Sequence, residues 1–148
     1  MANGGYDINP TLIKKKSDNI IKKRILNKNL SSQIIPIFRK VVEKGTATLS
    51  DVEGYEVGGK TGTAQIVENG TYTNKKINTF ASIFPSSDPE YVLIVLLEDT
   101  KLSKDYLYKY RNKPGSYKGT PFNTAGWTSV EISGKIIDKI GPILATKY

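Results

Sequence analysis

One short stretch of this sequence gathers groups that together could hold an anion. Lys60 is followed by Thr61, Gly62 and Thr63, and the pair Gly58-Gly59 precedes it. An ammonium group and two hydroxyls can bind a phosphate or a carboxylate through charge and hydrogen bonds. Glycine has no side chain, so a ligand could approach the backbone closely there. The secondary structure on either side of this stretch decides which kind of anion it could bind.

The stretch satisfies a phosphate-binding pattern. Residues Gly54 to Thr61 match G-x-x-x-x-G-K-[ST], the P-loop motif. A P-loop requires a buried strand before the motif and a helix after it, so that backbone N–H groups point at the phosphate. The preceding residues 45–53 are short and mixed, and the residues after Lys60 are rich in β-branched side chains, which favours a strand. A P-loop nucleotide-binding protein therefore remains only an alternative.

A strand would divide the four residues between two faces. Lys60 and Gly62 would lie on one face and Thr61 and Thr63 on the other, because successive side chains of a strand alternate. A glycine within a strand often marks close approach of a ligand or another backbone. We therefore predict a ligand-binding strand edge. An ordinary edge lysine, which discourages strand pairing, is the simpler explanation of Lys60.

The motif and its surroundings resemble a known family. The tetrapeptide Lys60–Thr63 resembles the K-[ST]-G motif of penicillin-binding proteins and serine β-lactamases. The order and spacing of the flanking segments are similar to class B penicillin-binding proteins, and the C-terminal segment is most similar to their cell-division branch. The segments that carry this similarity are 2–5, 10–13, 41–47, 54–65, 80–85, 91–97 and 125–144.

The resemblance implies a role for each residue of the motif. Lys60 would supply positive charge and support proton transfer, and Thr61 and Thr63 would offer hydroxyls to the substrate carboxylate. The backbone N–H of Thr63 would be one oxyanion donor. Gly62 would let the stem peptide of peptidoglycan, or a β-lactam, lie along the strand. The expected activity of the whole protein is D,D-transpeptidation in septum formation.

The resemblance also implies where the whole protein acts and with what. It would work in the bacterial periplasm, held at the inner membrane by an N-terminal segment that this sequence does not contain. Its partners would be the missing N-terminal part of the same domain and proteins of the division site. No nucleic acid and no cofactor is expected.

The family's nucleophile is not found in this chain. No serine has a lysine three residues later, and Ser133 with Lys135 is one residue out of register. The triplet 17–19 spells S-D-N, but it precedes Lys60 by far fewer residues than in the family, so we interpret it as coincidence. We therefore predict no catalytic nucleophile here, and an inactive fragment.

Composition narrows the remaining choices. The 148 residues fit one domain, and the absence of cysteine and histidine argues against a metal site. The net charge of +8 comes largely from clusters at 14–28 and 101–118. Neither cluster resembles a nucleic-acid-binding module, so both are interpreted as solvated surface. The longest apolar run, Tyr91 to Leu97, is far shorter than the ~20 residues that span a bilayer.

The predicted fold is α/β (α+β), a three-stranded antiparallel sheet with flanking helices. It would be the C-terminal portion of a β-lactamase/transpeptidase-like fold and a single partial domain. Ser31 or Ser32 would cap the first helix, Asn69-Gly70 would form a hairpin turn, and Thr128 with Glu131 would form a capping box. The predicted elements are a connector (1–30), a helix (31–44), strands within 57–98, a mobile basic loop (101–121) and a C-terminal helix (128–144).

Two further expectations concern surfaces. Tyr91 to Leu97 is apolar at every position, so both faces of that strand need cover, and the two helices are the available cover. Loss of the upstream half of the domain would leave an edge or face exposed and favour self-association. A non-catalytic module that binds ligands at a sheet edge remains a third interpretation.

Overall fold

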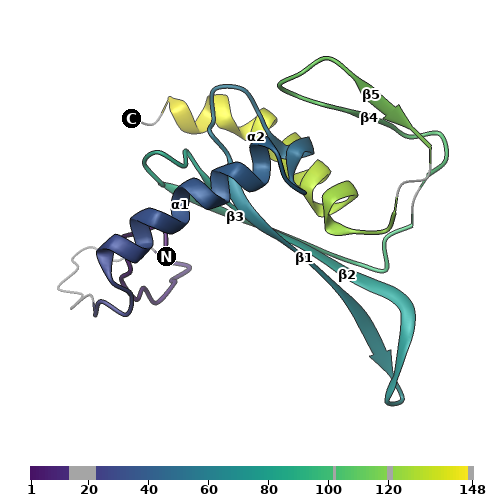
Figure 1. Ribbon diagram of the computed structural model, residues 1–148, viewed down its shortest axis with the longest axis horizontal. Coiled ribbons are helices and arrows are strands. Elements are labelled where there is room, and N and C mark those ends of the chain that lie inside the picture. The colour runs from purple at the N-terminus through teal and green to yellow at the C-terminus, as the bar shows by residue number, and fades with distance from the viewer. Residues whose placement is uncertain (14–22, 102, 120–121, 147–148) are drawn as a thin grey trace.

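The computed structural model describes residues 1–13, 23–101, 103–119 and 122–146. Helix α1 (Lys28–Glu43) precedes three strands, β1 (Gly58–Glu68), β2 (Thr71–Phe84) and β3 (Tyr91–Glu98). A short hairpin of β4 (Leu107–Lys109) and β5 (Ser116–Lys118) follows, and helix α2 (Ser129–Ala145) ends the described chain. Short 3-10 turns, η1 (Thr48–Ser50) and η2 (Ala125–Trp127), precede β1 and α2 respectively. Figure 1 shows the β1–β2 ribbon extending well beyond the helices.

The three-stranded antiparallel sheet is as predicted, with the order β1-β2-β3. The turn between β1 and β2 lies at Asn69 and Gly70, whose φ values of 50° and 76° suit the left-handed conformation of a tight hairpin turn. The register pairs Lys60 with Ala81 and Ala81 with Ile94. The strand β2 begins directly after the Asn69-Gly70 turn, because the hairpin pairing continues to Thr71.

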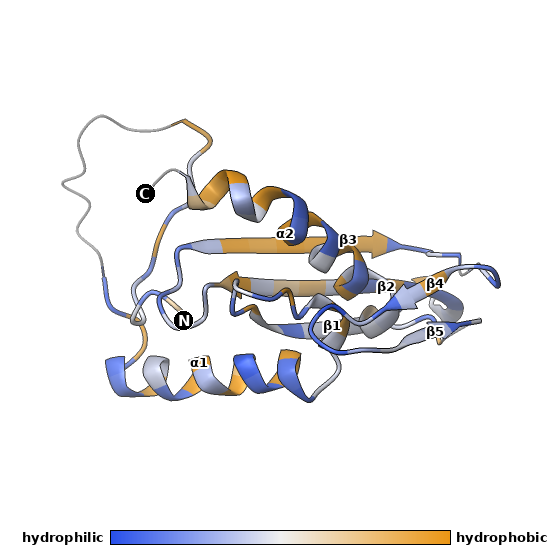
Figure 2. Ribbon diagram, turned by 90° about the horizontal axis from the view of Figure 1, so that it is seen from above, coloured by the Kyte–Doolittle hydropathy of each residue, from blue (hydrophilic) through white to orange (hydrophobic). Residues whose placement is uncertain are grey.

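Most of the core lies on the face of the sheet that carries Phe80 and Phe84, and on the other face Ile83 is also buried. Phe80 and Phe84 of β2 are buried with Val42 of α1 and with Val130 and Ile137 of α2. On the other face of β3 the exposed fractions are 68%, 63% and 58% for Val92, Ile94 and Leu96. The expectation that two helices cover both faces is therefore wrong. Figure 2 shows β3 as apolar along nearly its whole length.

Helix α1 starts three residues before the predicted start. The side chain of Asn27 accepts a hydrogen bond from the Asn29 N–H at 2.9 Å, so Asn27 is the N-cap rather than Ser31 or Ser32. Ser31 instead donates to the Met1 carbonyl. Pro36 consequently lies in the helix interior and not near its first turn.

Helix α2 matches the predicted C-terminal helix, but its capping box is wrong. The Thr128 hydroxyl donates to the Thr124 carbonyl at 2.9 Å and makes no cap bond. Glu131 is buried and accepts hydrogen bonds from Tyr106 and Arg111, both at 3.0 Å. Its carboxylate therefore ties α2 to the β4–β5 region.

The segment predicted as a mobile basic loop contains the β4–β5 hairpin. Tyr108 of β4 is 5% exposed and packs edge-on against Trp127 at 5.2 Å between ring centroids. Arg111 and Asn112 fasten the hairpin to the body of the chain. Arg111 forms an ion pair with Glu131 and donates to the Leu49 carbonyl, and Asn112 donates to Asp51. Local sequence shows no period here because each strand has only three residues.

Some predictions fall on parts of the chain that the structure does not describe. The S-D-N triplet at 17–19 and part of the basic cluster at 14–28 lie outside the described residues. Arg24, at the end of the predicted connector, forms an isolated antiparallel bridge with Tyr6. Within the described ranges, no helix is long and apolar enough to cross a bilayer.

Candidate functional site

Strand β1 places Lys60 on the open face of the sheet. Its side chain is exposed, and its ammonium group donates to the carbonyl oxygen of the next residue, Thr61, at 2.7 Å. Among the described residues, no carboxylate forms an ion pair with it. The positive charge of Lys60 is therefore available to an anionic ligand.

Thr61 and Thr63 point to the other face, as predicted from alternation. The Thr61 hydroxyl lies 2.9 Å from the hydroxyl of Thr46. The Thr63 hydroxyl donates to Asn78 Oδ1 at 3.2 Å and accepts from the Ala125 N–H at 3.0 Å. The Thr63 hydroxyl thus joins β1 to β2 and to η2, a structural role that the sequence analysis did not predict.

The polar link from Thr63 continues through two asparagines. Asn78 is fully buried and donates to Asn123 Oδ1 at 2.6 Å, and Asn123 donates to the Thr100 carbonyl at 3.1 Å. Sequence patterns do not predict this series of hydrogen bonds, because bonded residues are separated by up to 62 positions. The one sequence signal for a buried polar link is Asn78, an asparagine within an apolar strand pattern.

Strand β1 is an edge of the sheet, since it pairs only with β2 among the described strands. In an antiparallel strand, the N–H and C=O of one residue point to the same side, and successive residues alternate sides. Every second residue of β1 therefore presents both groups to the unpaired edge. An extended ligand could add to this edge as a further strand.

Gly62 leaves free space beside Lys60. A Cβ atom built there would lie 4.0 Å from its nearest neighbours, the Cβ and carbonyl oxygen of Thr79. Gly59 differs, because a Cβ there would lie 2.5 Å from the Ala81 carbonyl oxygen and 2.8 Å from the Phe80 ring. Packing therefore requires glycine at position 59 and does not require it at position 62.

A cavity of about 330 Å³ adjoins the threonine face of the motif. Its walls combine hydroxyl groups with the rings of Tyr110 and Trp127. Polar groups among aromatic walls are typical of ligand sites. The residues of the motif that line it are Thr61 and Thr63, and η1, η2 and the segment before η1 supply most of the rest.

The described serines near the sheet and α2 are not arranged as nucleophiles. The hydroxyls of Ser82, Ser129 and Ser133 donate to backbone carbonyls, and all three residues are nearly or fully buried. The described residues contain no group of three or more acidic, histidine or cysteine side chains that could hold a metal ion. The arrangement places an unpaired positive charge beside a strand edge, and the described residues show no activated hydroxyl.

The sequence matches a family model described as the penicillin binding protein transpeptidase domain, over residues 1–120. This match covers most of the chain. The chain belongs to the family of penicillin-binding protein transpeptidase domains. The P-loop alternative is wrong, because β1 continues as a strand to Glu68 and no helix N-terminus follows Lys60.

Two relatives show how much of a transpeptidase protein this chain represents. It is 42% identical over 88 residues to stage V sporulation protein D of Bacillus subtilis, covering 59% of this chain and 14% of that protein. It is 28% identical over 159 residues to a probable peptidoglycan D,D-transpeptidase FtsI of Caulobacter vibrioides, covering 99% of this chain and 25% of that protein. The chain therefore spans a quarter or less of these relatives.

Solved transpeptidase domains share the fold. The transpeptidase domain of FtsI4 from Legionella pneumophila aligns with a TM-score of 0.60 and 23% identity, over 94% of this chain and 42% of that one. The domain of penicillin-binding protein 3 from Burkholderia pseudomallei aligns with a TM-score of 0.61 and 21% identity, over 86% and 35%. More than half of each solved chain has no counterpart here.

Proposed function

We propose that this chain is the C-terminal part of a class B transpeptidase domain and that β1 binds the stem peptide of peptidoglycan, or a β-lactam, along its open edge. The whole protein would then cross-link peptidoglycan by D,D-transpeptidation during septum formation. The observation that supports this most is a combination of three features. Within the described residues, the strand edge is unpaired and the Lys60 ammonium has no ion-pair partner, and packing does not require the glycine at position 62.

The main chain of β1 supports a role for the Thr63 N–H as an oxyanion donor. The Lys60 ammonium reaches the Thr61 carbonyl, which favours a Thr61 carbonyl that points to the open edge. The N–H groups of Thr61 and Thr63 would then point to the same edge, because residues two apart in a strand are equivalent. A preorganised N–H donor aimed at developing negative charge is a major source of acyl-transfer catalysis.

The side chains of Lys60, Thr61 and Thr63 would have three different roles in substrate binding. Lys60 would attract the substrate carboxylate and influence proton transfer, and the Thr61 hydroxyl, which can rotate away from Thr46, would donate to that carboxylate. The Thr63 hydroxyl is already engaged with Asn78 and Ala125, so its contribution would be to hold the strand in place.

The nucleophilic serine would come from the part of the domain that has no counterpart in this sequence. The surface next to Lys60 supports this, because Val92, Ile94 and Leu96 form an exposed apolar strip on the same face of the sheet. An apolar strip of this kind marks a buried interface in the complete domain. The whole protein would act in the periplasm, anchored in the inner membrane by an N-terminal segment.

Substitution of Gly62 tests the proposal in the complete parent protein. Gly62→Val should fill the space beside Lys60 and reduce the rate of β-lactam acylation by about tenfold or more, since overpacking of a ligand site costs about 1–3 kcal/mol. The control is Ala64→Val, because Ala64 lies one pleat further along the same face of β1. Acylation should be nearly normal in the control. Normal acylation of both variants at unchanged thermal stability would contradict a substrate role for this edge.

A further inference from the structure

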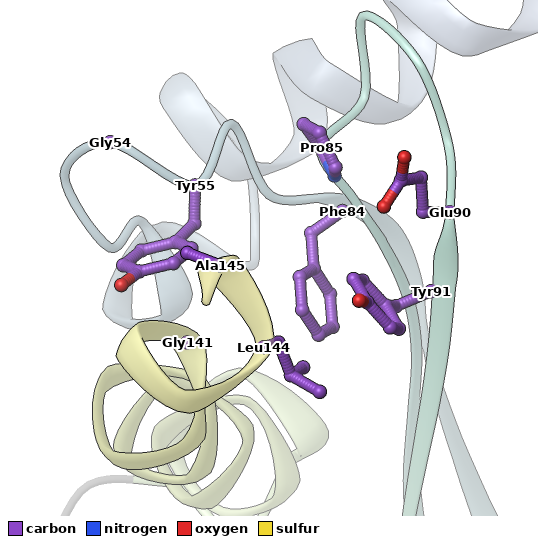
Figure 3. A pocket seen from close by; sticks show the side chains of 9 residues that line it. All are labelled: Gly54, Tyr55, Phe84, Pro85, Glu90, Tyr91, Gly141, Leu144 and Ala145. Carbon is purple, nitrogen blue, oxygen red and sulfur yellow. The ribbon is translucent and has the colours of Figure 1, made fainter. Parts of the chain in front are cut away.

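A second cavity lies away from the Lys60–Thr63 edge, where the end of α2 meets the turn between β2 and β3 (Figure 3). It has a volume of about 260 Å³, and no residue of β1 lines it. Its residues are mostly apolar or aromatic, and only Glu90 is charged. The function proposed for β1 assigns this cavity no role.

Two of its walls are held in place by packing. Phe84 and Tyr91 are partners across β2 and β3, and their rings stack with centroids 5.3 Å apart and planes inclined by 28°. On the opposite wall the Tyr55 ring lies directly against Gly141, where a Cβ atom would collide with it. Glycine is unfavourable inside a helix. Gly141 is explained by the Tyr55 ring, which occupies the space that a side chain at position 141 would need.

Glu90 places a negative charge at the rim of this aromatic cavity. In Figure 3 its carboxylate turns toward Pro85 and Phe84 rather than away from them. In the described part of the chain, no basic residue lines the cavity and Glu90 takes part in no ion pair. A cation that enters here would meet a carboxylate and the faces of aromatic rings.

We propose that this cavity binds a small organic ammonium ion that carries one apolar ring. Its volume lies just below the range of about 300–1,000 Å³ that is typical of ligand sites, so one ring and a short chain are the size that fits. The apolar body would contact Leu144 and the stacked pair, and the ammonium group would lie between Glu90 and an aromatic face, where cations are attracted by the ring quadrupole.

The overall charge of the chain opposes this binding only weakly at moderate salt. The net charge of +8 repels a cation at long range. At 0.1 M ionic strength the Debye length is about 10 Å, so distant lysines are largely screened while the contact with Glu90 is not. The test is therefore made at 0.1 M salt.

The experiment compares three probes, each with one phenyl ring and a short chain, on the intact, isotopically labelled chain. In an NMR titration 2-phenylethylammonium should bind about tenfold more tightly than neutral 2-phenylethanol, as expected from one exposed ion pair and one cation–π contact. The anion 3-phenylpropionate should bind most weakly. The shifted amide signals should belong to Tyr55, the 84–91 turn and the end of α2.

Two variants and a control complete the test. Glu90→Gln should remove the preference for the ammonium probe while the neutral probe still binds, and Leu144→Trp should fill the cavity and abolish binding of both. Glu98→Gln, at the exposed opposite end of β3, should change nothing. An ammonium preference that survives Glu90→Gln, binding unaffected by Leu144→Trp in a folded variant, or signal shifts confined to other regions would overturn the proposal.

Discussion

The two halves of the Gly58–Thr63 stretch both contain glycine, but the first half is buried and the second is largely exposed. Gly58 and Gly59 are buried, and a Cβ atom at either would press on α1, β2 or the ring of Phe80. From Lys60 the strand emerges on an open face, and Gly62 has free space around it. The first pair fixes the strand against the core, and the second part leaves room for a ligand. A glycine-rich motif can therefore contain both glycines that packing requires and a glycine that packing does not require.

The largest expected effect is the absence of any covalent reaction at the open half of the stretch. The chain of 148 residues has no Ser-x-x-Lys, no cysteine and no histidine to activate a hydroxyl. Loss of a nucleophile and its activating partners typically removes on the order of 10⁶ in rate. We expect no labelling of this chain by fluorescent penicillin. Intact-mass measurement of a stoichiometric adduct on Ser82 or Ser129 would show that the assignment is wrong.

The next largest effect is expected at Gly59. Gly59→Val should lower the free energy of unfolding by about 3 kcal/mol, the upper end of typical overpacking, because its neighbours are a backbone carbonyl and the fully buried Phe80. Gly62→Val should change it by less than about 1 kcal/mol, as for an exposed strand position. Urea unfolding measures both variants. Equal losses would remove the distinction between the two halves of the strand.

Thr63 should show an intermediate effect. Thr63→Val keeps the shape but leaves the N–H of buried Ala125 without its acceptor, so a loss of about 1–3 kcal/mol is expected. Thr61→Val is the matched control. Among the described residues its hydroxyl contacts only the hydroxyl of the exposed Thr46, so the loss of stability should be below about 1 kcal/mol. Urea unfolding of the two variants is the measurement, and Thr63→Val should have the lower midpoint. A lower midpoint for Thr61→Val would place the structural link at Thr61.

The smallest effect is a loss of stability at alkaline pH. Burial raises the pKa of the Tyr108 phenol above its ordinary value of 10.0, and the hydrogen bond to Tyr106 raises the pKa of the Lys135 ammonium above 10.5. For both groups the stabilising contribution is complete below the unfolded-state pKa and is lost as pH rises through the folded-state pKa. Urea midpoints should therefore be constant up to about pH 9 and fall above pH 10.

A phenylalanine variant isolates the tyrosine part of that change. Tyr108→Phe should show a smaller alkaline loss than the wild type, since only the Lys135 contribution remains. The Thr63→Val variant keeps both Tyr108 and Lys135, so it should lose stability in parallel with the wild type over this range. An alkaline loss that is unchanged by Tyr108→Phe would contradict the assignment to Tyr108.

Local signals predicted much of the fold and the strand that carries the site. The β-branched run after Lys60, the Asn69-Gly70 turn and the apolar run from Tyr91 each specify their element within a few residues, and the structure confirms them. The resemblance to class B penicillin-binding proteins is confirmed by the family match. The roles of Lys60–Thr63 stay predictions.

The parts that sequence could not predict depend on distant partners. The β4–β5 hairpin has little internal pattern and is held by Trp127 and by Arg111 with Glu131. The spacing of Glu131 from Thr128 predicts a capping box. In the structure Glu131 instead forms a buried ion pair with Arg111, 20 residues away. Likewise, alternation placed Thr63 on the correct face but could not show that Ala125 would be its partner.

The aromatic cluster behind the motif gives this chain an optical reporter. Trp127 is the one tryptophan in the sequence, and it contacts Tyr108 and Tyr117 at 5.2 and 5.1 Å between ring centroids. It also lines the cavity that Thr61 and Thr63 share. Selective excitation of this indole would report on ligand arrival at the threonine face, while tyrosine-to-tryptophan energy transfer would follow detachment of the β4–β5 hairpin. One chromophore could thus distinguish occupancy of the cavity from local unfolding without an added label.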